Sequence, residues 1–94
     1  MSKEGDGMRK LYTRAFKEFF FRHLTATRSR LHCTQAEMAE KLAMDERSYA
    51  DLDRGLSCCS ALTLALYLIY CCEDPLAFLH QLHSALEQER DHAA

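Results

Sequence analysis

The sequence predicts an all-α protein, a single five-helix domain with an extended first helix. Glycine and proline are scarce, because the 94 residues contain one Pro and three Gly, and two of these glycines lie within the first seven positions. This leaves too few turn residues for an all-β sandwich or barrel. Apolar residues recur at spacings of three and four along much of the chain, the period of an amphipathic helix. A chain of this length has room for one hydrophobic core.

The first helix is expected over residues 8–30, after a polar segment, residues 1–7, that we expect to be disordered. Its bases lie on the outer face. The inward positions are Leu11, Ala15, Phe16, Phe19, Phe20, His23, Leu24 and Ala26 or Thr27. Phe21 widens the apolar stripe, which leaves two interpretations: a broadly buried helix, or an exposed aromatic on a partner surface.

Two short helices follow in the segment 34–55. Thr34 and Glu37 have the spacing of a capping box, so a helix begins here. Asp45 is a second N-cap, and the helix after it ends at Gly55. The inner faces of these two helices carry Met38, Ala39, Leu42, Tyr49 and Leu52. Two short helices joined by a tight turn form the helix-turn-helix pattern.

Two further helices complete the domain, which we place at residues 8–90. Ser57 or Ser60 caps an apolar helix around Ala61 to Cys72, which we expect to be buried. A bilayer requires roughly 18 to 20 apolar residues, so this helix is too short to cross a membrane. Asp74 and Pro75 supply the N-cap and first residue of the last helix. Its apolar stripe is Leu76, Leu79, Leu82 and Leu86, and residues 91–94 are expected to fray.

The five cysteines cannot all pair within one chain, and the N-terminus lacks an apolar export segment. We therefore expect reduced thiols and a cytoplasmic location. The doublets Cys58-Cys59 and Cys71-Cys72, with the histidines, contain the atoms of a zinc site. Adjacent cysteines on a helix point about 100° apart, however, so packing roles are favoured and no metal or cofactor is expected. His80 and His83 are interpreted as surface residues, and no constellation indicates an enzyme.

Charge is distributed unevenly along the chain. Residues 1–33 hold eight Lys and Arg against three acids, and residues 34–94 hold four against eleven. Opposite charges in the two halves indicate either a charged partner or two solvated faces that attract each other.

The segment between Arg28 and Gly55 resembles the phage-repressor and Cro type of helix-turn-helix domain, the XRE family, with its lambda-repressor-like fold. Arg28 and the run Thr-Gln-Ala-Glu-Met-Ala-Glu-Lys-Leu-Ala-Met-Asp-Glu-Arg-Ser-Tyr-Ala-Asp-Leu-Asp-Arg-Gly carry the resemblance. The downstream apolar helix and Asp-Pro-Leu-Ala-Phe-Leu extend it, over about residues 20–80. It implies a transcriptional regulator that binds double-stranded DNA sequence-specifically, as a homodimer on two half-sites.

The resemblance also implies roles for individual residues. It places Gln35 and Thr34 beside a DNA phosphate, and the face of the third helix in the major groove. The positions expected to contact DNA are Thr34, Gln35, Glu46, Arg47, Asp51 and Arg54. The resemblance also implies a structural ion pair between Arg28 and Asp53, joining the first and third helices.

Two positions depart from the family pattern, because Ala43 and His32 stand where the family prefers Gly. Either the backbone there adopts a positive φ, at a cost of roughly 1 kcal/mol for Ala43, or the turn is built differently.

The helix-turn-helix segment itself is acidic, since residues 34–55 hold six acids and three bases, and the loop after Gly55 is uncharged. Bases of the first helix would therefore have to reach the phosphates. The alternative is a protein-protein interaction module whose acidic third helix binds a basic partner. For a homodimer, the stripe Leu79, Leu82 and Leu86 or the face Phe19–Phe21 is a candidate interface, and intramolecular core is the alternative for both.

Overall fold

The computed structural model describes residues 3–93, with side chains from residue 7 to residue 92. This part of the chain is all-α and contains no strand. Its five helices are α1 (Lys3–Leu31), α2 (Gln35–Lys41), α3 (Glu46–Asp53), α4 (Ala61–Tyr70) and α5 (Pro75–Ala93). The all-α, five-helix prediction is confirmed.

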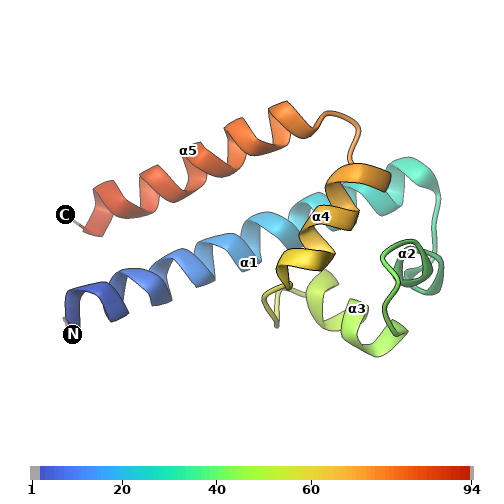
Figure 1. The fold of residues 1–94 in the computed structure, drawn as a ribbon, viewed down its shortest axis with the longest axis horizontal. Helices are drawn as coiled ribbons and strands as arrows, with labels where there is room; N and C mark the ends of the chain where they lie inside the picture. The colour runs from blue at the N-terminus through green and yellow to red at the C-terminus, as the bar shows by residue number, and fades with distance from the viewer. Residues whose placement is uncertain (1–2, 94) are drawn as a thin grey trace.

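Two long helices and a cluster of three short ones make up the molecule (Figure 1). The long helices α1 and α5 pack side by side and run in opposite directions. The short helices α2, α3 and α4 gather around the C-terminal half of α1. The N-terminal half of α1 therefore extends past α3, in a molecule that measures 41 × 26 × 19 Å.

The first and last helices are longer than expected. The structure begins α1 at Lys3, so the prediction of disorder is wrong for residues 3–7, and residues 1–2 lie outside the described chain. An established helix gains one hydrogen bond for each residue it adds, and Gly5 and Gly7 weaken this extension without breaking it. Residues 91–93 likewise continue α5 instead of fraying, and residue 94 is not described.

The predicted caps define the short helices. Thr34 and Glu37 form the full capping box at the start of α2, with each side chain bonded to the other residue's backbone N–H. Asp45 accepts from the Ser48 amide at the start of α3. Of the two serines considered, Ser60 caps α4. Asp74 caps α5, directly before Pro75.

The core lies between α1 and the other four helices. It contains the residues expected from α2 and α3, together with side chains of α1 and α5 and of the α4 region. Its buried members are Phe20, Leu24, Met38, Ala39, Leu42, Tyr49, Leu52, Tyr67, Cys71 and Phe78. Phe21 is half-buried, with its ring against Gly55, so the broadly buried interpretation of α1 holds at this position.

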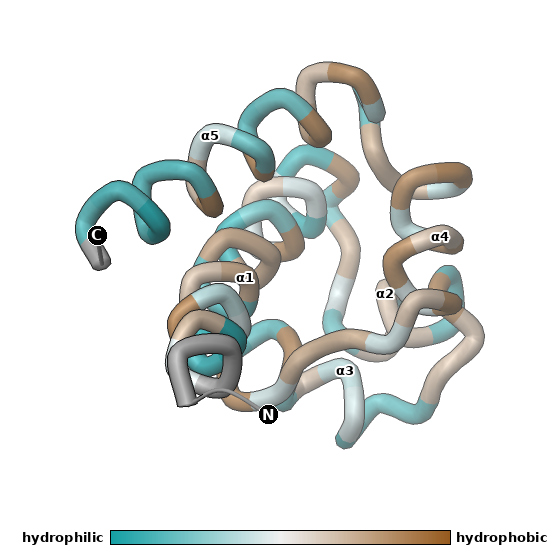
Figure 2. Tube along the Cα trace, turned by 60° about the vertical axis from the view of Figure 1, so that its left-hand side comes forward, coloured by the Kyte–Doolittle hydropathy of each residue, from teal (hydrophilic) through white to brown (hydrophobic). Residues whose placement is uncertain are grey.

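The prediction that the Ala61–Cys72 helix is buried is wrong for part of its surface. Thr63, Tyr67 and Cys71 face the core at spacings of four, whereas Leu62 is 67% and Tyr70 69% exposed. Figure 2 shows the hydrophobic colour along α4, in contrast to the hydrophilic end of α5. Leu64, Leu66 and Leu68 lie half-buried against the core beside this stripe, and the exposed part of α4 includes Leu62, Ile69 and Tyr70. No helix in that range is long and apolar enough to cross a membrane.

Candidate nucleic-acid interface

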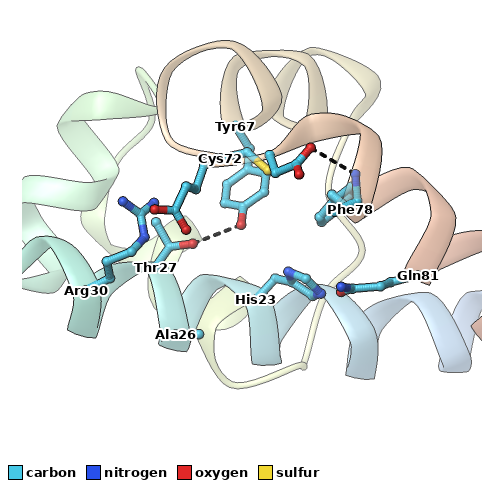
Figure 3. Close-up of a pocket in the computed structure, with 11 residues that line it drawn as sticks. His23, Ala26, Thr27, Arg30, Tyr67, Cys72, Phe78 and Gln81 are labelled. Atoms are coloured by element: carbon cyan, nitrogen blue, oxygen red, sulfur yellow. Dashed lines mark hydrogen bonds between the residues drawn. The ribbon is translucent and has the colours of Figure 1, made fainter.

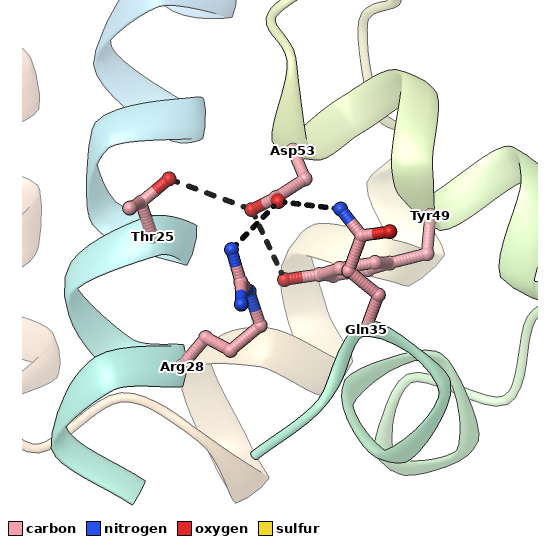
Figure 4. Close-up of polar contacts among 5 residues, drawn as sticks. All are labelled: Thr25, Arg28, Gln35, Tyr49 and Asp53. Carbon is pink, nitrogen blue, oxygen red and sulfur yellow. Dashed lines mark hydrogen bonds and ion pairs between the residues drawn. The ribbon is translucent and has the colours of Figure 1, made fainter. Parts of the chain in front are cut away.

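A polar cluster centred on Asp53 fixes the position of α3 (Figure 4). Asp53 is 9% exposed, and its carboxylate accepts from Arg28 of α1 at 3.1 Å and from Gln35 of α2 at 2.9 Å. Tyr49 and Thr25 add longer bonds of 3.4 and 3.5 Å. The predicted Arg28–Asp53 ion pair is therefore present. Three helices are joined at a single carboxylate.

The cluster includes contacts that the sequence did not indicate. The sequence pattern indicated no role for Thr25 and assigned Tyr49 only to the core. Tyr49 precedes Asp53 by one turn of α3, and its hydroxyl bonds to the Asp53 carboxylate. Burial, followed by the neighbouring Asp53 carboxylate, raises the pKa of Tyr49 above its ordinary value. The phenol therefore stays protonated and donates. The Nε of Arg28 is buried without a partner among the described residues.

Gln35, expected at a DNA phosphate, points its side chain toward Asp53 (Figure 4). A primary amide carries two N–H donors, and Asp53 takes one of them. The half-buried Gln35 thus has a structural bond and one remaining donor. Its neighbour Thr34 is exposed, and the Thr34 oxygen accepts from the Glu37 amide. In return, the backbone N–H of Thr34 holds the pKa of Glu37 below its usual value.

The outer face of α3 carries the residues expected to read bases. Glu46 and Arg47 are exposed, and Asp51 is half-buried. Arg54, the exposed C-cap residue, follows Asp51 by three positions, and Asp51 follows Arg47 by four, so these three share one helix face. None of these four side chains makes an ion pair with any other side chain that the structure describes.

The connections around α2 are built from left-handed residues. Ala43, in the turn between α2 and α3, and His32, before α2, both have φ of 55°. The positive-φ alternative therefore holds at both positions. Gly55, after α3, has φ of 73° and lies against the Phe21 ring. The turn geometry is kept without glycine at the first two of these positions, at a conformational cost.

A second polar site lies between α1 and the start of α5 (Figure 3). It is a cavity of about 310 Å³ lined by His23, Thr27, Arg30, Tyr67, Phe78 and other side chains. The hydroxyls of Thr27 and Tyr67 bond to each other at 2.9 Å, and Arg30 donates to the Cys71 carbonyl at 2.8 Å. Partial burial lowers the pKa of His23, while the nearby Gln81 amide acts in the opposite sense. These bonds hold the α4 region against α1.

The cysteine doublets do not form a shared site. All five cysteines are free thiols, with Cys58 exposed and Cys71 buried. Within the described residues, no three His, Cys, Asp or Glu side chains are placed to hold a metal ion. Burial raises the pKa of the Cys59 thiol to about 11 and moves that of Cys71 in the same direction. Both groups are protonated at neutral pH, the form that suits packing.

Comparisons with protein-family models, curated proteins and solved structures found no match to this chain. The geometry that bears on function is a helix, α3, whose inner side is bonded to α1 and α2 at Asp53 and whose outer side faces solvent.

Proposed function

We propose that the protein is a sequence-specific, DNA-binding transcriptional regulator of the phage-repressor type, with α3 in the major groove. The observation that carries the proposal is that α3 is fixed from behind at Asp53 while its outer face is free of ion pairs within the described chain. Base reading needs side chains on a rigid element, because loose donors lose discrimination. Five free thiols are compatible with action in the cytoplasm.

Each proposed contact follows from side-chain chemistry. Arg47 has the fork geometry for a bidentate bond to guanine, and Glu46 or Asp51 can accept from the N4 amino group of cytosine. Such a pair contributes about 1 to 3 kcal/mol of discrimination. Arg54 and the remaining Gln35 donor contact phosphates, with Thr34 beside them. Phosphate contacts set the orientation, and base contacts set the sequence preference.

We propose that two copies bind as a homodimer. The face Phe19–Phe21 is used internally, since Phe20 is buried and Phe19 packs on Phe78. The predicted leucine stripe is also partly packed within the domain, because Leu82 is half-buried against the core. The exposed apolar side chains on α4 and the first turns of α5 are Leu62, Ile69, Tyr70, Leu76 and Leu79. These side chains supply the surface for self-association, which sedimentation of wild type and Ile69→Lys would test.

The decisive experiment is a titration of labelled duplex with protein at several salt concentrations. Duplexes are first enriched from a random pool, because the operator is unknown. We expect affinity to fall as salt rises, with a linear relation between log K and log salt concentration. Arg47→Ala should bring the enriched and scrambled duplexes closer in affinity. Failure to bind any duplex at low salt would contradict the proposal.

A second function is favoured by the net acidity of residues 34–55 and the uncharged loop at residues 56–59. In this alternative, exposed Glu46 and half-buried Asp51 dock a basic protein surface. The double variant Glu46→Gln, Asp51→Asn separates the two functions. DNA affinity should rise non-specifically if the helix meets phosphates, whereas binding to a basic partner should weaken.

A further inference from the structure

One face of α1 contacts α3 and then continues beyond it. Thr25 and Arg28 on this face reach Asp53, and Phe21 lies against Gly55 at the end of α3. A Cβ built on Gly55 would stand 3.1 Å from the Phe21 ring, so this ring lies close against the Gly55 backbone. The contact establishes which side of α1 faces α3.

The same face carries three bases in the N-terminal half of α1. Lys10, Arg14 and Lys17 precede Phe21 at spacings of four, three and four, which place them on one helix face. We call these three residues the basic stripe. In Figure 1 this half of α1 extends past the end of α3, while α5 runs along another side of it. The basic stripe therefore lies on the side of α1 on which α3 lies, mostly beyond the end of α3, and the Arg14 side chain also reaches Glu89 of α5.

The basic stripe meets the candidate DNA-binding face at Arg54. Arg14 and Lys17 line one hollow together with Arg54, Gly55 and Phe21. Arg54 shares the outer face of α3 with Arg47 and Asp51. The basic stripe thus continues the surface that begins on α3.

The charge of this surface is positive. Glu18 also lines the hollow, but its carboxylate pairs with Arg22 at 2.7 Å. Arg14 pairs with Glu89 at 3.5 Å, with the Arg14 side chain 74% exposed. Lys10 and Lys17 make no ion pair with another described side chain. Lys10 and Arg14 are exposed and Lys17 is half-buried, and cations at such a surface keep most of their charge available for a partner.

We propose that the basic stripe binds the phosphate backbone of the same duplex that α3 enters. This inference depends on the proposed function. The basic stripe would supply the positive charge that the helix-turn-helix segment lacks. A rise of 1.5 Å per residue makes the stripe about 10 Å long, comparable to the length along the axis of about three successive phosphates of one strand. Screening has a range of about 8 Å at physiological salt, so the bases must lie close to the backbone to act.

The test compares two double variants that remove the same charge. Lys10→Gln, Lys17→Gln removes two stripe cations. Lys41→Gln, Arg90→Gln removes two exposed cations elsewhere, Lys41 at the end of α2 and Arg90 beside Glu87 on α5. Lys, Arg and Gln have similar helix propensities, so both variants should fold. Matching urea midpoints would verify this, and Lys17→Gln alone gives a milder form of the same test.

We expect the stripe variant to bind the enriched duplex at least tenfold more weakly at about 0.1 M salt. The slope of log K against log salt should become shallower by nearly two, since each lost phosphate contact contributes about 0.9. The affinity ratio between enriched and scrambled duplex should stay the same, because phosphates carry no sequence information. The control variant should keep the wild-type slope.

An unchanged slope in the stripe variant, with wild type binding normally, overturns the basic stripe and leaves the role of α3 intact. An equal change in the control variant also overturns it, because net charge would then explain the effect. Absence of duplex binding by wild type contradicts the proposed function itself. The two failures are therefore distinguishable.

Discussion

At the scale of single residues, the connections around α2 hold strain that the sequence could remove. Ala43 and His32 adopt φ of 55°, a conformation that brings Cβ close to the following carbonyl oxygen. The turn is retained because hydrogen bonds enclose it, with the Met44 amide bonded to the Ala39 carbonyl at 3.0 Å. Packing of Met38, Ala39 and Leu42 into the core supplies the compensating stabilisation.

Ala43→Gly should therefore stabilise the protein. Glycine relieves about 1 to 2 kcal/mol of left-handed strain but loses roughly 0.4 to 1 kcal/mol through greater freedom of the unfolded chain. We expect the free energy of unfolding to rise by about 0.5 to 1 kcal/mol, measured by urea denaturation. The matched control, Ala65→Gly inside α4, should lower it by roughly 1 kcal/mol. A loss of stability in both variants would argue against the strained turn.

His23 makes the stability dependent on pH. Burial lowers its folded-state pKa below the ordinary 6.5, so the unfolded chain takes up a proton first as pH falls. Stability should therefore be complete above pH 6.5 and decline as pH drops through the folded-state pKa. Urea midpoints measured between pH 7.5 and 5.5 should show this decline. His23→Gln should flatten the curve in that range, and an unchanged curve would exclude His23 as its cause.

At the scale of elements, one carboxylate sets the arrangement of α1, α2 and α3. Asp53 accepts bonds from residues that are 18, 25 and 28 positions earlier in the chain. The short helices α2 and α3 have seven and eight residues, too few to be stable alone in water. Their caps define where they begin, and the Asp53 bonds and core packing keep them in place.

Asp53→Ala should lower the free energy of unfolding by about 2 to 3 kcal/mol, because it leaves half-buried Arg28 and buried Tyr49 without their acceptor. The matched control is Asp51→Ala, two residues away on the same helix with no side-chain bond given by the structure. We expect the control to change stability by less than about 0.5 kcal/mol. Chemical denaturation of both variants measures the difference. Equal effects would contradict the role of Asp53 as the acceptor that joins the three helices.

At the scale of the whole molecule, the contact between α1 and α5 joins the two ends of the sequence. Phe78 of α5 is 1% exposed, and its ring lies within 5.5 Å, between centroids, of the rings of Phe19, His23 and Tyr67. These aromatic contacts connect α5 both to α1 and to α4. The last helix therefore stabilises its own packing on α1, and it also stabilises the arrangement of helices that holds α3 in place.

Phe78→Ala should lower the free energy of unfolding by about 3 to 5 kcal/mol, the usual cost of emptying an aromatic site in a core. That loss is large for a small domain, and the variant is expected to be partly unfolded at 37 °C. Leu76→Ala, at a position 72% exposed, is the control and should change stability by less than about 0.5 kcal/mol. Thermal unfolding followed by circular dichroism checks both. A small loss of stability in Phe78→Ala would show that α5 contributes little to the stability of the domain.

Local signals made most of the elements predictable. Side chains that bond to amides a few residues away define the starts of α2, α3 and α5, and these caps can be found without knowing the fold. The ends of α1 and α5 were not predictable, because polar helical turns carry neither an apolar period nor a stop signal. The exposure of α4 was also missed, since an apolar run does not say how many of its faces a neighbour covers.

The candidate site also contains one contact that was predictable from the sequence and several that were not. The Arg28–Asp53 pair was expected from the family resemblance, whereas the bonds of Thr25, Gln35 and Tyr49 to Asp53 became visible only with the helices in place. The helical spacing of the bases in the basic stripe is visible in the sequence. Their relation to Arg54 depends on the contact between Phe21 and Gly55, which are 34 positions apart.

The sequence by itself determined an all-α chain of five helices, the caps that begin its short helices, and the apolar positions that form its core. These features depend on interactions within a few residues, which the order of side chains specifies. Only the tertiary structure decided which donors share Asp53, which faces of α4 stay exposed, and that the bases of α1 continue the surface of α3. Those features depend on the distance between segments, which packing sets and local patterns do not record.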